Sequence, residues 1–351
     1  MKKIELTISS IIRQPNDIVT YKLTHIEPIW FTSGQFIILE FIVNGKYIRR
    51  SYSLNNSPYV NEPLSISVKR VDNGEISRLL QDKYTIGDKL TSYEASGQFV
   101  FEPQPTAKRN IFLLGAGSGI APLFSILKSA LVTEKNSNII LVYSNRAPET
   151  TLFYDELLAI KKRYPIQFIS IFLFSTAKNL SMARLNRELL ERLVIEHSHF
   201  PNKQSLFYTC GPADYMLMCK IVLTGMGFAD QLKKETFVLP EDESDEDDET
   251  GLETKAIDKA SYTVKLTANK ISHNLAIPYP KTILDVALER GIEIPYSCKA
   301  GMCGSCIAKC TQGKVKMLYN EVLTDNEVRQ GKILLCAARP LEDDVELNIN
   351  W

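Results

Sequence analysis

Four cysteines near the carboxyl end of the chain have a spacing that very few folds can use. Cys298, Cys303 and Cys306 form the pattern C-x4-C-x2-C, and Cys336 follows after 29 intervening residues. This spacing is typical of plant-type [2Fe–2S] sites, in which one loop supplies three thiolates and a separate element supplies the fourth. A structural zinc site is the alternative, but four-cysteine zinc sites usually pair two C-x2-C motifs. We therefore predict that these four cysteines are cluster ligands.

The other cysteines and the amino terminus indicate a reducing compartment. No cysteine precedes Cys210, while Cys310 is expected in a strand or turn and Cys219 on the buried face of a helix. Met1–Thr7 alternates like a strand and lacks the apolar core of a signal peptide, and no run of about 18 apolar residues occurs. We expect a cytoplasmic protein that does not span a membrane and in which disulfides are not favoured.

The first part of the chain, residues 1–107, has the pattern of antiparallel β-structure. Runs rich in Ile, Val, Thr and Tyr lie at Ile4–Ile12, Ile18–Ile26 and Phe36–Val43. Turn signals such as Asn44-Gly45 separate the runs. Several short strands joined by close turns are typical of a barrel or a sandwich.

Residues 108–240 change to an alternation of apolar, strand-like runs with helical stretches. That alternation is the signature of a parallel α/β sheet. The predicted strands are Ile111–Leu114, Ile139–Tyr143, Phe168–Phe174 and Leu206–Tyr208, and the predicted helices are Pro122–Val132, Phe153–Lys162, Leu185–Glu196 and Ala213–Met226.

An acidic segment follows, and we predict a solvated linker over residues 241–257. Eight of the nine residues from 241 to 249 are Asp or Glu, and such a block repels itself and cannot bury a core. The whole chain has 41 basic and 41 acidic residues, and this balance argues against a nucleic-acid binder. Without the acidic block the net charge would be +8, and a basic surface suits phosphate-bearing dinucleotides.

Residues 258–351 are predicted to fold again as a smaller domain. Tyr262–Thr267 and Asn274–Tyr279 have the pattern of a hairpin pair. Thr282–Asp285 has the pattern of a capping box that opens a helix, which Gly291 would end. The cysteine loop follows, and a short terminal strand completes this part of the chain.

The cysteine loop also resembles a known family. Pro295–Cys306, together with Leu335–Pro340, resembles a plant-type ferredoxin domain. The order of the folded segments then resembles the ferredoxin–NADP reductase superfamily with a carboxyl-terminal ferredoxin, and within it the reductase components of bacterial oxygenases. The resemblance implies an antiparallel β-barrel flavin domain, an α/β parallel-sheet nucleotide domain and an α+β ferredoxin-like (β-grasp) domain. These would occupy residues 1–107, 108–240 and 258–351.

A flavin signature lies in the first of these segments. Arg50-Ser51-Tyr52-Ser53-Leu54 matches the R-x-Y-S motif of the family. By that resemblance Tyr52 packs on the isoalloxazine ring, Ser53 lies near its N5 atom, and Arg50 meets the pyrophosphate, which suits a guanidinium fork. Gly74-Glu75-Ile76-Ser77 resembles the second phosphate loop, at a helix N-terminus. These features favour FAD, with FMN as the alternative. The predicted flavin-binding residues are Arg50, Tyr52, Ser53, Leu54, Val68, Lys69, Gly74, Ile76, Ser77 and Phe237.

A nicotinamide signature lies in the second segment. Gly115-Ala116-Gly117-Ser118-Gly119 follows a strand and opens a helix, with Pro122 in its first turn. Such glycines let backbone amides approach a pyrophosphate. Ser144 and Arg146 end the next strand, where a 2′-phosphate would bind, so NADPH is favoured and NADH stays open. The predicted nucleotide-binding residues are Gly115, Gly117, Ser118, Gly119, Pro122, Ser144, Arg146, Cys210, Gly211 and Pro212.

Three residues are candidates for the hydride-transfer site by the same resemblance. Cys210, in a Cys-Gly-Pro turn, shapes the place of the nicotinamide. Ser53 and Glu235 lie near flavin N5, and Phe237 covers the flavin. A buried cysteine at a strand end and an ordinary terminal strand over Lys234–Phe237 are the alternative interpretations.

These signatures together predict an NAD(P)H-dependent reductase. Hydride would pass to FAD, and single electrons would pass through the [2Fe–2S] cluster to a protein acceptor, an oxygenase or hydroxylase by the resemblance. A stand-alone ferredoxin or flavodoxin reductase, or a diaphorase, is the alternative with the same chemistry. A non-catalytic zinc-binding interaction protein is the alternative of a different class. No Ser/His/Asp triad pattern or HExxH motif competes, and four histidines are few for a histidine-built metal site.

Overall fold

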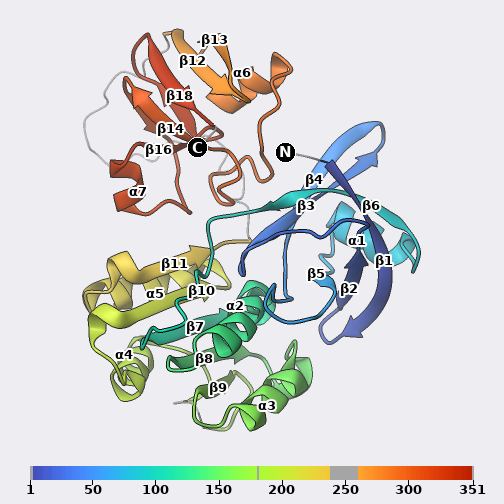
Figure 1. The fold of residues 1–351 in the computed structure, drawn as a ribbon, viewed down its shortest axis with the longest axis vertical. Coiled ribbons are helices and arrows are strands. Elements are labelled where there is room, and N and C mark those ends of the chain that lie inside the picture. The colour runs from blue at the N-terminus through green and yellow to red at the C-terminus, as the bar shows by residue number, and fades with distance from the viewer. Residues whose placement is uncertain (1–2, 180–181, 238–259, 350–351) are drawn as a thin grey trace. The chain divides into compact units, whose positions relative to one another are not determined.

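The computed structural model describes residues 3–179, 182–237 and 260–349, and the predicted linker at 241–257 lies outside them. The chain divides into two compact units, Lys2–Phe237 and Val238–Trp351. The first unit holds a six-stranded and a five-stranded sheet, and the second holds a five-stranded and a two-stranded sheet (Figure 1). The boundary predicted at residues 107 and 108 falls inside the first unit, between its two sheets.

The first sheet is an antiparallel barrel, as the sequence predicts. Its elements are β1 (Lys3–Gln14), β2 (Ile18–Thr24), β3 (Phe36–Val43), β4 (Lys46–Ser53), β5 (Leu64–Lys69), helix α1 (Glu75–Lys83) and β6 (Lys89–Ser96). The strand order is β4-β3-β6-β1-β2-β5, and a bridge between Leu54 and Ile66 closes the sheet on itself. Along β1, Ile4, Leu6 and Ile8 enter the core in alternation with less buried residues, because successive side chains of a strand point to opposite faces.

The second sheet is parallel and lies between two pairs of helices. Its strands are β7 (Asn110–Ala116), β8 (Asn138–Asn145), β9 (Phe168–Phe174), β10 (Ser205–Cys210) and β11 (Leu232–Glu235), and its helices are α2 (Ile120–Thr133), α3 (Tyr154–Arg163), α4 (Arg187–His197) and α5 (Ala213–Gly225). The strand order is β11-β10-β7-β8-β9, and each predicted helix agrees with the structure within two residues at either end.

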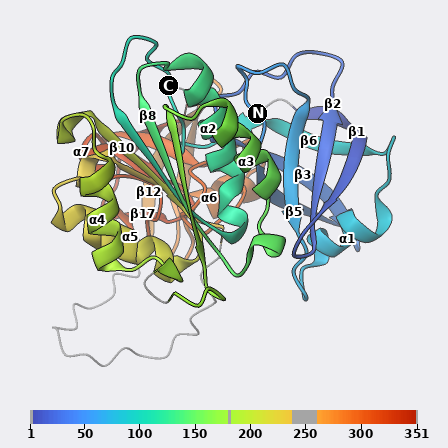
Figure 2. The same cartoon turned by 90° about the horizontal axis from the view of Figure 1, so that it is seen from below.

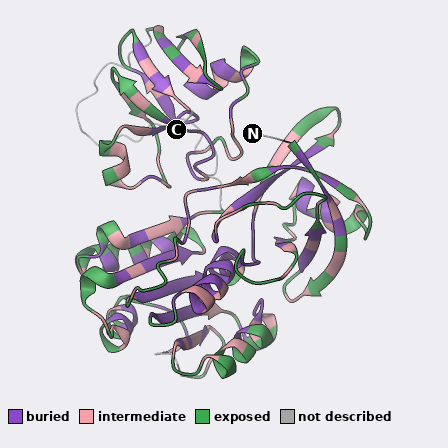
Figure 3. Cartoon of the chain, in the orientation of Figure 1, coloured by how far each residue is buried: buried purple, intermediate pink, exposed green. Residues whose placement is uncertain are grey.

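Alternate residues of the central strand pack on opposite sides of this sheet. Ile111 and Leu113 join the cluster of α2 and α3, whereas Phe112 and Leu114 join the cluster of α4 and α5. Figure 2 shows the two helix pairs on opposite faces, and Figure 3 shows the buried strands between them. Burial on both faces explains why these strands have continuous apolar sequences rather than alternating ones.

The second unit has a mixed sheet and two short helices. Its elements are β12 (Tyr262–Ala268), β13 (Ile271–Ile277), α6 (Ile283–Glu289), β14 (Ile307–Gln312), β15 (Val315–Met317), α7 (Asp325–Arg329), β16 (Lys332–Leu334), β17 (Ala338–Pro340) and β18 (Val345–Asn348). The main sheet has the order β13-β12-β18-β14-β16, and β15 pairs with β17 separately. The predicted capping box is present, since Thr282 accepts from the Asp285 amide and the Asp285 carboxylate accepts from the Thr282 amide.

The hairpin predicted in this unit is correct, but its second strand begins three residues earlier than expected. The sequence prediction placed that strand at Asn274–Tyr279, whereas β13 spans Ile271–Ile277. Asn269 and Lys270 both have positive φ, at 50° and 65°, and form a two-residue turn that starts the return strand at once. Within the described part of the chain, every helix is too short or too polar to cross a bilayer.

Candidate functional site

Three strand ends of the first unit bring together the three predicted catalytic residues. Ser53 is the last residue of β4, Cys210 the last of β10, and Glu235 the last of β11. Cys210 and Glu235 are register partners in the parallel pair β10–β11. The Ser53 hydroxyl donates a hydrogen bond to Glu235 Oε2 at 2.9 Å, although the two residues are 182 positions apart. All three side chains are buried, so the barrel and the parallel sheet meet at this group.

Burial controls the chemistry of the cysteine in this group. Cys210 is fully buried, and burial together with the Glu235 carboxylate raises the pKa of its thiol well above the usual range. A thiolate is the nucleophilic form of cysteine, and this environment disfavours it. Cys210 is therefore suited to shaping the site as a neutral thiol rather than to covalent catalysis.

The glycine-rich loop packs directly on the Cys-Gly-Pro turn. Gly117–Gly119 form a 3-10 turn between β7 and α2, and Gly117 has a φ of 54°. A Cβ atom on Gly119 would lie 2.2 Å from the Cys210 carbonyl oxygen, and one on Gly211 would lie 3.0 Å from the Ala116 Cβ. Glycine is thus required for this close approach. The predicted Pro122 is buried in the first turn of α2, and Pro212 precedes the first residue of α5.

The carboxyl edge of the parallel sheet carries buried polar atoms that make no hydrogen bond of standard geometry to any described residue. They are Ser144 Oγ, Asn145 Nδ2, Thr209 Oγ1 and Tyr215 OH. Tyr215 and Ser144 interact with each other, and Thr209 lies beside the Cys219 thiol. Because buried polar atoms in folded proteins are nearly always paired, a polar ligand held at this edge would complete their hydrogen bonding. Parallel sheets bind nucleotides at their carboxyl ends, and the donor set suits a dinucleotide. The predicted Arg146 follows β8 directly, is exposed, and has its carbonyl oxygen held by the Thr176 hydroxyl at 2.8 Å.

The predicted flavin-binding residues lie on β4, on β5 and at the start of α1. Tyr52 is half-buried and burial raises the pKa of its phenol, whereas Arg50 is exposed and donates to the Arg49 carbonyl at 2.9 Å. Leu54 and Val68 are buried, and Lys69 is the last residue of β5.

The second predicted flavin element is a tight turn before α1. The Ser77 hydroxyl accepts from the Val71 amide at 3.1 Å and donates to the Gly74 carbonyl at 3.2 Å, which closes the turn. Ile76 is buried beside it. A contact of Ser77 with a flavin phosphate stays a prediction. The terminal strand predicted over Lys234–Phe237 lies two residues earlier in the structure, because β11 spans Leu232–Glu235; Phe237 lies beyond it, 46% exposed.

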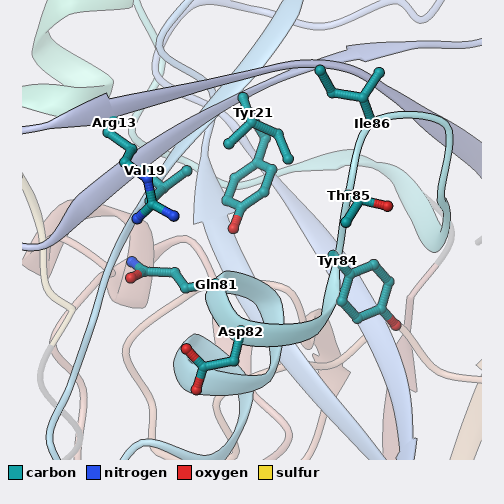
Figure 4. A pocket seen from close by; sticks show the side chains of 9 residues that line it. Arg13, Val19, Tyr21, Gln81, Asp82, Tyr84, Thr85 and Ile86 are labelled. Carbon is teal, nitrogen blue, oxygen red and sulfur yellow. The ribbon is translucent and has the colours of Figure 1, made fainter.

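A cavity of about 550 Å³ lies elsewhere on the barrel (Figure 4). Its walls come from β1, β2, α1 and the segment after α1, and the side chains of Arg13, Tyr21 and Gln81 face it. None of the residues predicted to bind flavin or nucleotide lines this cavity. It is therefore separate from the group around Ser53.

In the second unit, the backbone of the cysteine loop directs amides at sulfur atoms. The amides of Ala300 and Met302 both donate to Cys298 Sγ at 3.4 Å, and the amide of Gly301 donates to Cys336 Sγ at 3.3 Å. Gly301 has a φ of 67°, and this left-handed turn is open to glycine without strain. Hydrogen bonds of this kind stabilise thiolate ligands and tune an iron–sulfur cluster.

The four predicted ligands are near one another. Cys306 and Cys336 are buried, and Cys298 and Cys303 are half-buried. The hydrogen bond that the Cys303 thiol donates to Cys298, together with burial, raises the pKa of that thiol. In the described residues, no three His, Cys, Asp or Glu side chains surround a single ion position. A binuclear cluster shares four thiolates between two irons, so the four sulfurs need not surround one point. Cys310 lies on β14, as predicted, and its thiol donates to backbone carbonyls at Gln312 and Gly313.

Comparison with known proteins identifies the three parts of the chain. The family described as "Oxidoreductase FAD-binding domain" matches residues 3–101, "Oxidoreductase NAD-binding domain" matches residues 113–220, and "2Fe-2S iron-sulfur cluster binding domain" matches residues 266–341. Together with the site geometry, these matches define an NAD(P)H-dependent oxidoreductase that uses FAD and a [2Fe–2S] cluster.

Relatives match the chain over almost its whole length. It is 30% identical to a component of the 1,2-phenylacetyl-CoA epoxidase of Escherichia coli (strain K12), over 98% of this chain and 97% of that protein. It is also 30% identical to the ferredoxin reductase component of 3-ketosteroid-9-alpha-monooxygenase of Rhodococcus rhodochrous, over 99% of this chain and 97% of that protein. The chain belongs to this family of flavin- and iron–sulfur-dependent reductases.

A solved structure has the same fold. Phthalate dioxygenase reductase superposes with a TM-score of 0.60 at 24% identity, over 99% of this chain and 98% of that one. A barrel, a parallel sheet and a ferredoxin-like part are thus a known architecture, as the sequence predicts.

The sequence did not indicate every polar residue at the carboxyl edge of the parallel sheet. Asn145, Thr209 and Tyr215 carry buried polar atoms at the nucleotide edge, and none was predicted. Asn145 and Thr209 adjoin predicted residues, so chain position could have indicated them. Tyr215 required the fold, because its place depends on how α5 packs against the sheet.

Proposed function

We propose that this protein is the reductase component of a multicomponent oxygenase or hydroxylase, which passes electrons from NAD(P)H to a separate oxygenase protein. The observation that carries the proposal is the contact of Ser53 with Glu235 beside Cys210, in a chain that also brings Cys336 against the loop of three cysteines. Ser53, Glu235 and Cys210 suit a site of hydride transfer, and the four cysteines suit a centre of one-electron transfer. Two relatives of nearly the same length are an epoxidase component and a monooxygenase reductase component.

Each residue of the hydride-transfer group has a distinct part in this proposal. FAD, when bound, supplies the exchange between a two-electron hydride and single electrons. The Glu235 carboxylate orients the Ser53 hydroxyl, which presents a polar group from the end of β4. The Cys210 carbonyl lies against Gly119, and the buried, neutral Cys210 thiol helps to exclude water. The group therefore orients the two reactants and keeps the site dry.

The proposed coenzymes are FAD and NADPH. The turn closed by Ser77 at the start of α1 favours a second phosphate, as FAD has and FMN lacks. Arg146 is exposed at the carboxyl edge of the parallel sheet, and a guanidinium suits a 2′-phosphate.

In the variant Arg146→Ala, KM for NADPH should rise roughly tenfold, the size expected for one charge-assisted hydrogen bond, with KM for NADH unchanged. Arg187→Ala, at an exposed site on α4, is the control, and equal effects on both coenzymes would refute the NADPH preference.

The identity of the protein that accepts the electrons is tested by reconstitution with the purified full-length protein. NADPH added without oxygen should bleach the flavin and then the cluster, and the reduced protein should support turnover of an oxygenase component captured from the same cells. Reduction of a free ferredoxin or flavodoxin, without any oxygenase turnover, would favour a stand-alone reductase. Purified protein without flavin, iron and acid-labile sulfide would refute the enzymatic proposal altogether. The cytoplasmic location is part of the proposal, and cell fractionation tests it.

A further inference from the structure

A short segment of the second unit, Leu318–Glu321, joins the two parts of the chain that carry the cysteines; we call it the strap. The Leu318 amide donates to the Ala337 carbonyl at 2.9 Å, next to Cys336. The Glu321 amide donates to the Gly301 carbonyl at 3.1 Å, within the cysteine loop. The strap therefore bonds at one end to the segment with the fourth cysteine and at the other end to the loop with the first three.

Tyr319 lies in the middle of the strap and contacts both parts with its side chain. Its hydroxyl lies 3.2 Å from the Cys336 carbonyl oxygen and 3.4 Å from the Lys299 carbonyl oxygen, so its single proton is shared between the two acceptors. The ring lies against Gly301, because a Cβ atom there would be only 2.7 Å from Tyr319 Cδ2. Tyr319 thus touches the cysteine loop and the fourth-cysteine segment at once.

The contact with Gly301 is the important one for the cluster. Gly301 has positive φ, and its amide donates to Cys336 Sγ at 3.3 Å. The Tyr319 ring packs on this residue from outside while the Tyr319 hydroxyl holds the Cys336 backbone. One side chain therefore contacts both the residue that donates the amide and the backbone of the residue that carries the sulfur.

The partial exposure of Tyr319 indicates that its side chain covers the cysteine loop and does not fill the core of the unit. The side chain is 40% exposed and makes no part of the buried core cluster of the unit. An aromatic ring at such a place covers the loop with one face and leaves the other to water. Its neighbour Leu318 is equally exposed, at 42%, and touches the fourth-cysteine segment through its backbone amide.

We propose that Tyr319 is a positioning residue for the [2Fe–2S] cluster: it holds the Gly301 amide against Cys336 Sγ and covers that side of the loop. The inference rests on the proposed assignment of the four cysteines as ligands. Residues that orient metal ligands from outside typically change metal affinity 10–100-fold when altered. Tyr319 stands between the third and fourth cysteines and belongs to none of the predicted motifs.

The test uses the full-length protein with its flavin and cluster. Tyr319→Ala should lose the visible absorbance of the cluster roughly 10–100-fold faster than wild type under a chelator. Tyr319→Phe keeps the ring and loses only the hydroxyl, so its cluster loss should accelerate roughly fivefold, the size of one hydrogen bond. Leu318→Ala keeps the backbone contact and is the matched control, with a wild-type rate expected. The electron paramagnetic resonance spectrum of the reduced cluster should change in Tyr319→Ala and not in the control.

The outcomes separate this inference from the proposed function. Flavin reduction by NADPH should be unchanged in every variant, which shows that the first unit is intact. Wild-type cluster loss and an unchanged spectrum in both Tyr319 variants would overturn the inference alone. If Tyr319→Ala does not fold, Tyr319→Phe decides by itself, and a wild-type rate there would also overturn the inference. A wild-type protein without iron and sulfide would overturn the proposed function and this inference with it.

Discussion

The cysteine loop and the hydride-transfer group obtain their geometry in opposite ways. In the loop, three of the four thiols lie within the nine residues Cys298–Cys306, and local turns direct amides at sulfur. In the other group, Ser53, Cys210 and Glu235 come from the ends of three strands, and 182 positions separate the first from the last. Residue spacing therefore determines the first site, whereas sheet order and register determine the second. The two sites should respond to different substitutions.

The largest expected effect is the complete loss of one site with the other intact. Cys303→Ser should abolish the cluster, because a serine hydroxyl is a poor replacement for a thiolate ligand of iron. Transfer to a one-electron protein acceptor such as cytochrome c should stop, while NADPH reduces the flavin at the wild-type rate. Iron and sulfide analysis with anaerobic stopped-flow spectroscopy measures both. Cys310→Ser, a thiol outside the spacing, is the control, and full acceptor reduction in Cys303→Ser would contradict the electron path.

The next effect tests the site that depends on strand positions. In Gly119→Ala the new methyl group would lie 2.2 Å from the Cys210 carbonyl oxygen, so the glycine-rich loop and the end of β10 must separate. A displacement of about 1 Å can cost roughly 10²-fold in rate, and we expect that loss in flavin reduction by NADPH. Cluster content should not change.

A matched glycine shows whether the loss comes from packing. Gly225 ends α5, and a Cβ atom there would meet nothing within 4 Å. Gly225→Ala should leave hydride transfer unchanged. Equal losses in both variants would mean that the close approach of Gly119 to Cys210 is not what limits the reaction.

The contrast between the two sites also explains how much the sequence alone could predict. The four cysteines were predicted as cluster ligands from their spacing, because three of them lie on one loop whose own turns shape it. The strands and helices of the parallel sheet were predicted within a few residues, because burial on both faces leaves long apolar runs such as Ile111–Leu114. The resemblance placed Ser53 and Glu235 near one flavin atom, but their direct hydrogen bond depends on the order β11-β10-β7 and on how the barrel packs.

The errors have physical causes of the same kind. The start of β13 was misplaced because Asn269 and Lys270 adopt positive φ, a conformation that composition does not reveal for lysine. Tyr215 and Tyr319 were missed because their neighbours are distant in sequence: Tyr215 lies beside Ser144, and the Tyr319 hydroxyl meets the Cys336 carbonyl. A side chain whose partners come from another element has no local pattern to indicate it.

A smaller effect tests the hydrogen bond within the group itself. Ser53→Ala removes the donor to Glu235 Oε2, so the carboxylate is no longer oriented from β4. Flavin reduction by NADPH should slow roughly tenfold or somewhat more, with KM little changed, because the strands keep their positions. Ser9→Ala, an exposed serine on β1 that donates to the Lys22 carbonyl, is the control. A raised KM with unchanged kcat would instead place Ser53 in coenzyme binding.

The smallest expected effect tests whether the cysteine site depends on the helix α6 that packs beside it. Thr282 caps α6, and the Leu284 amide of that helix donates to the Leu335 carbonyl at 3.1 Å, next to Cys336. Thr282→Ala should lower the free energy of unfolding of the second unit by about 1 kcal/mol, as for other lost helix caps. Because α6 holds the residue before Cys336, cluster loss under a chelator should also accelerate a few-fold.

The matched control for this variant is a second cap in the same unit. Thr324 caps α7 with the same capping-box geometry, and α7 packs near β16. Thr324→Ala should cost a similar free energy of unfolding, measured by thermal denaturation, without the same acceleration of cluster loss. If both variants release the cluster equally fast, cluster loss depends on the stability of the whole second unit and not on the bond between α6 and Leu335. The geometry of the cysteine site would then depend on more of the fold than the cysteine spacing indicates.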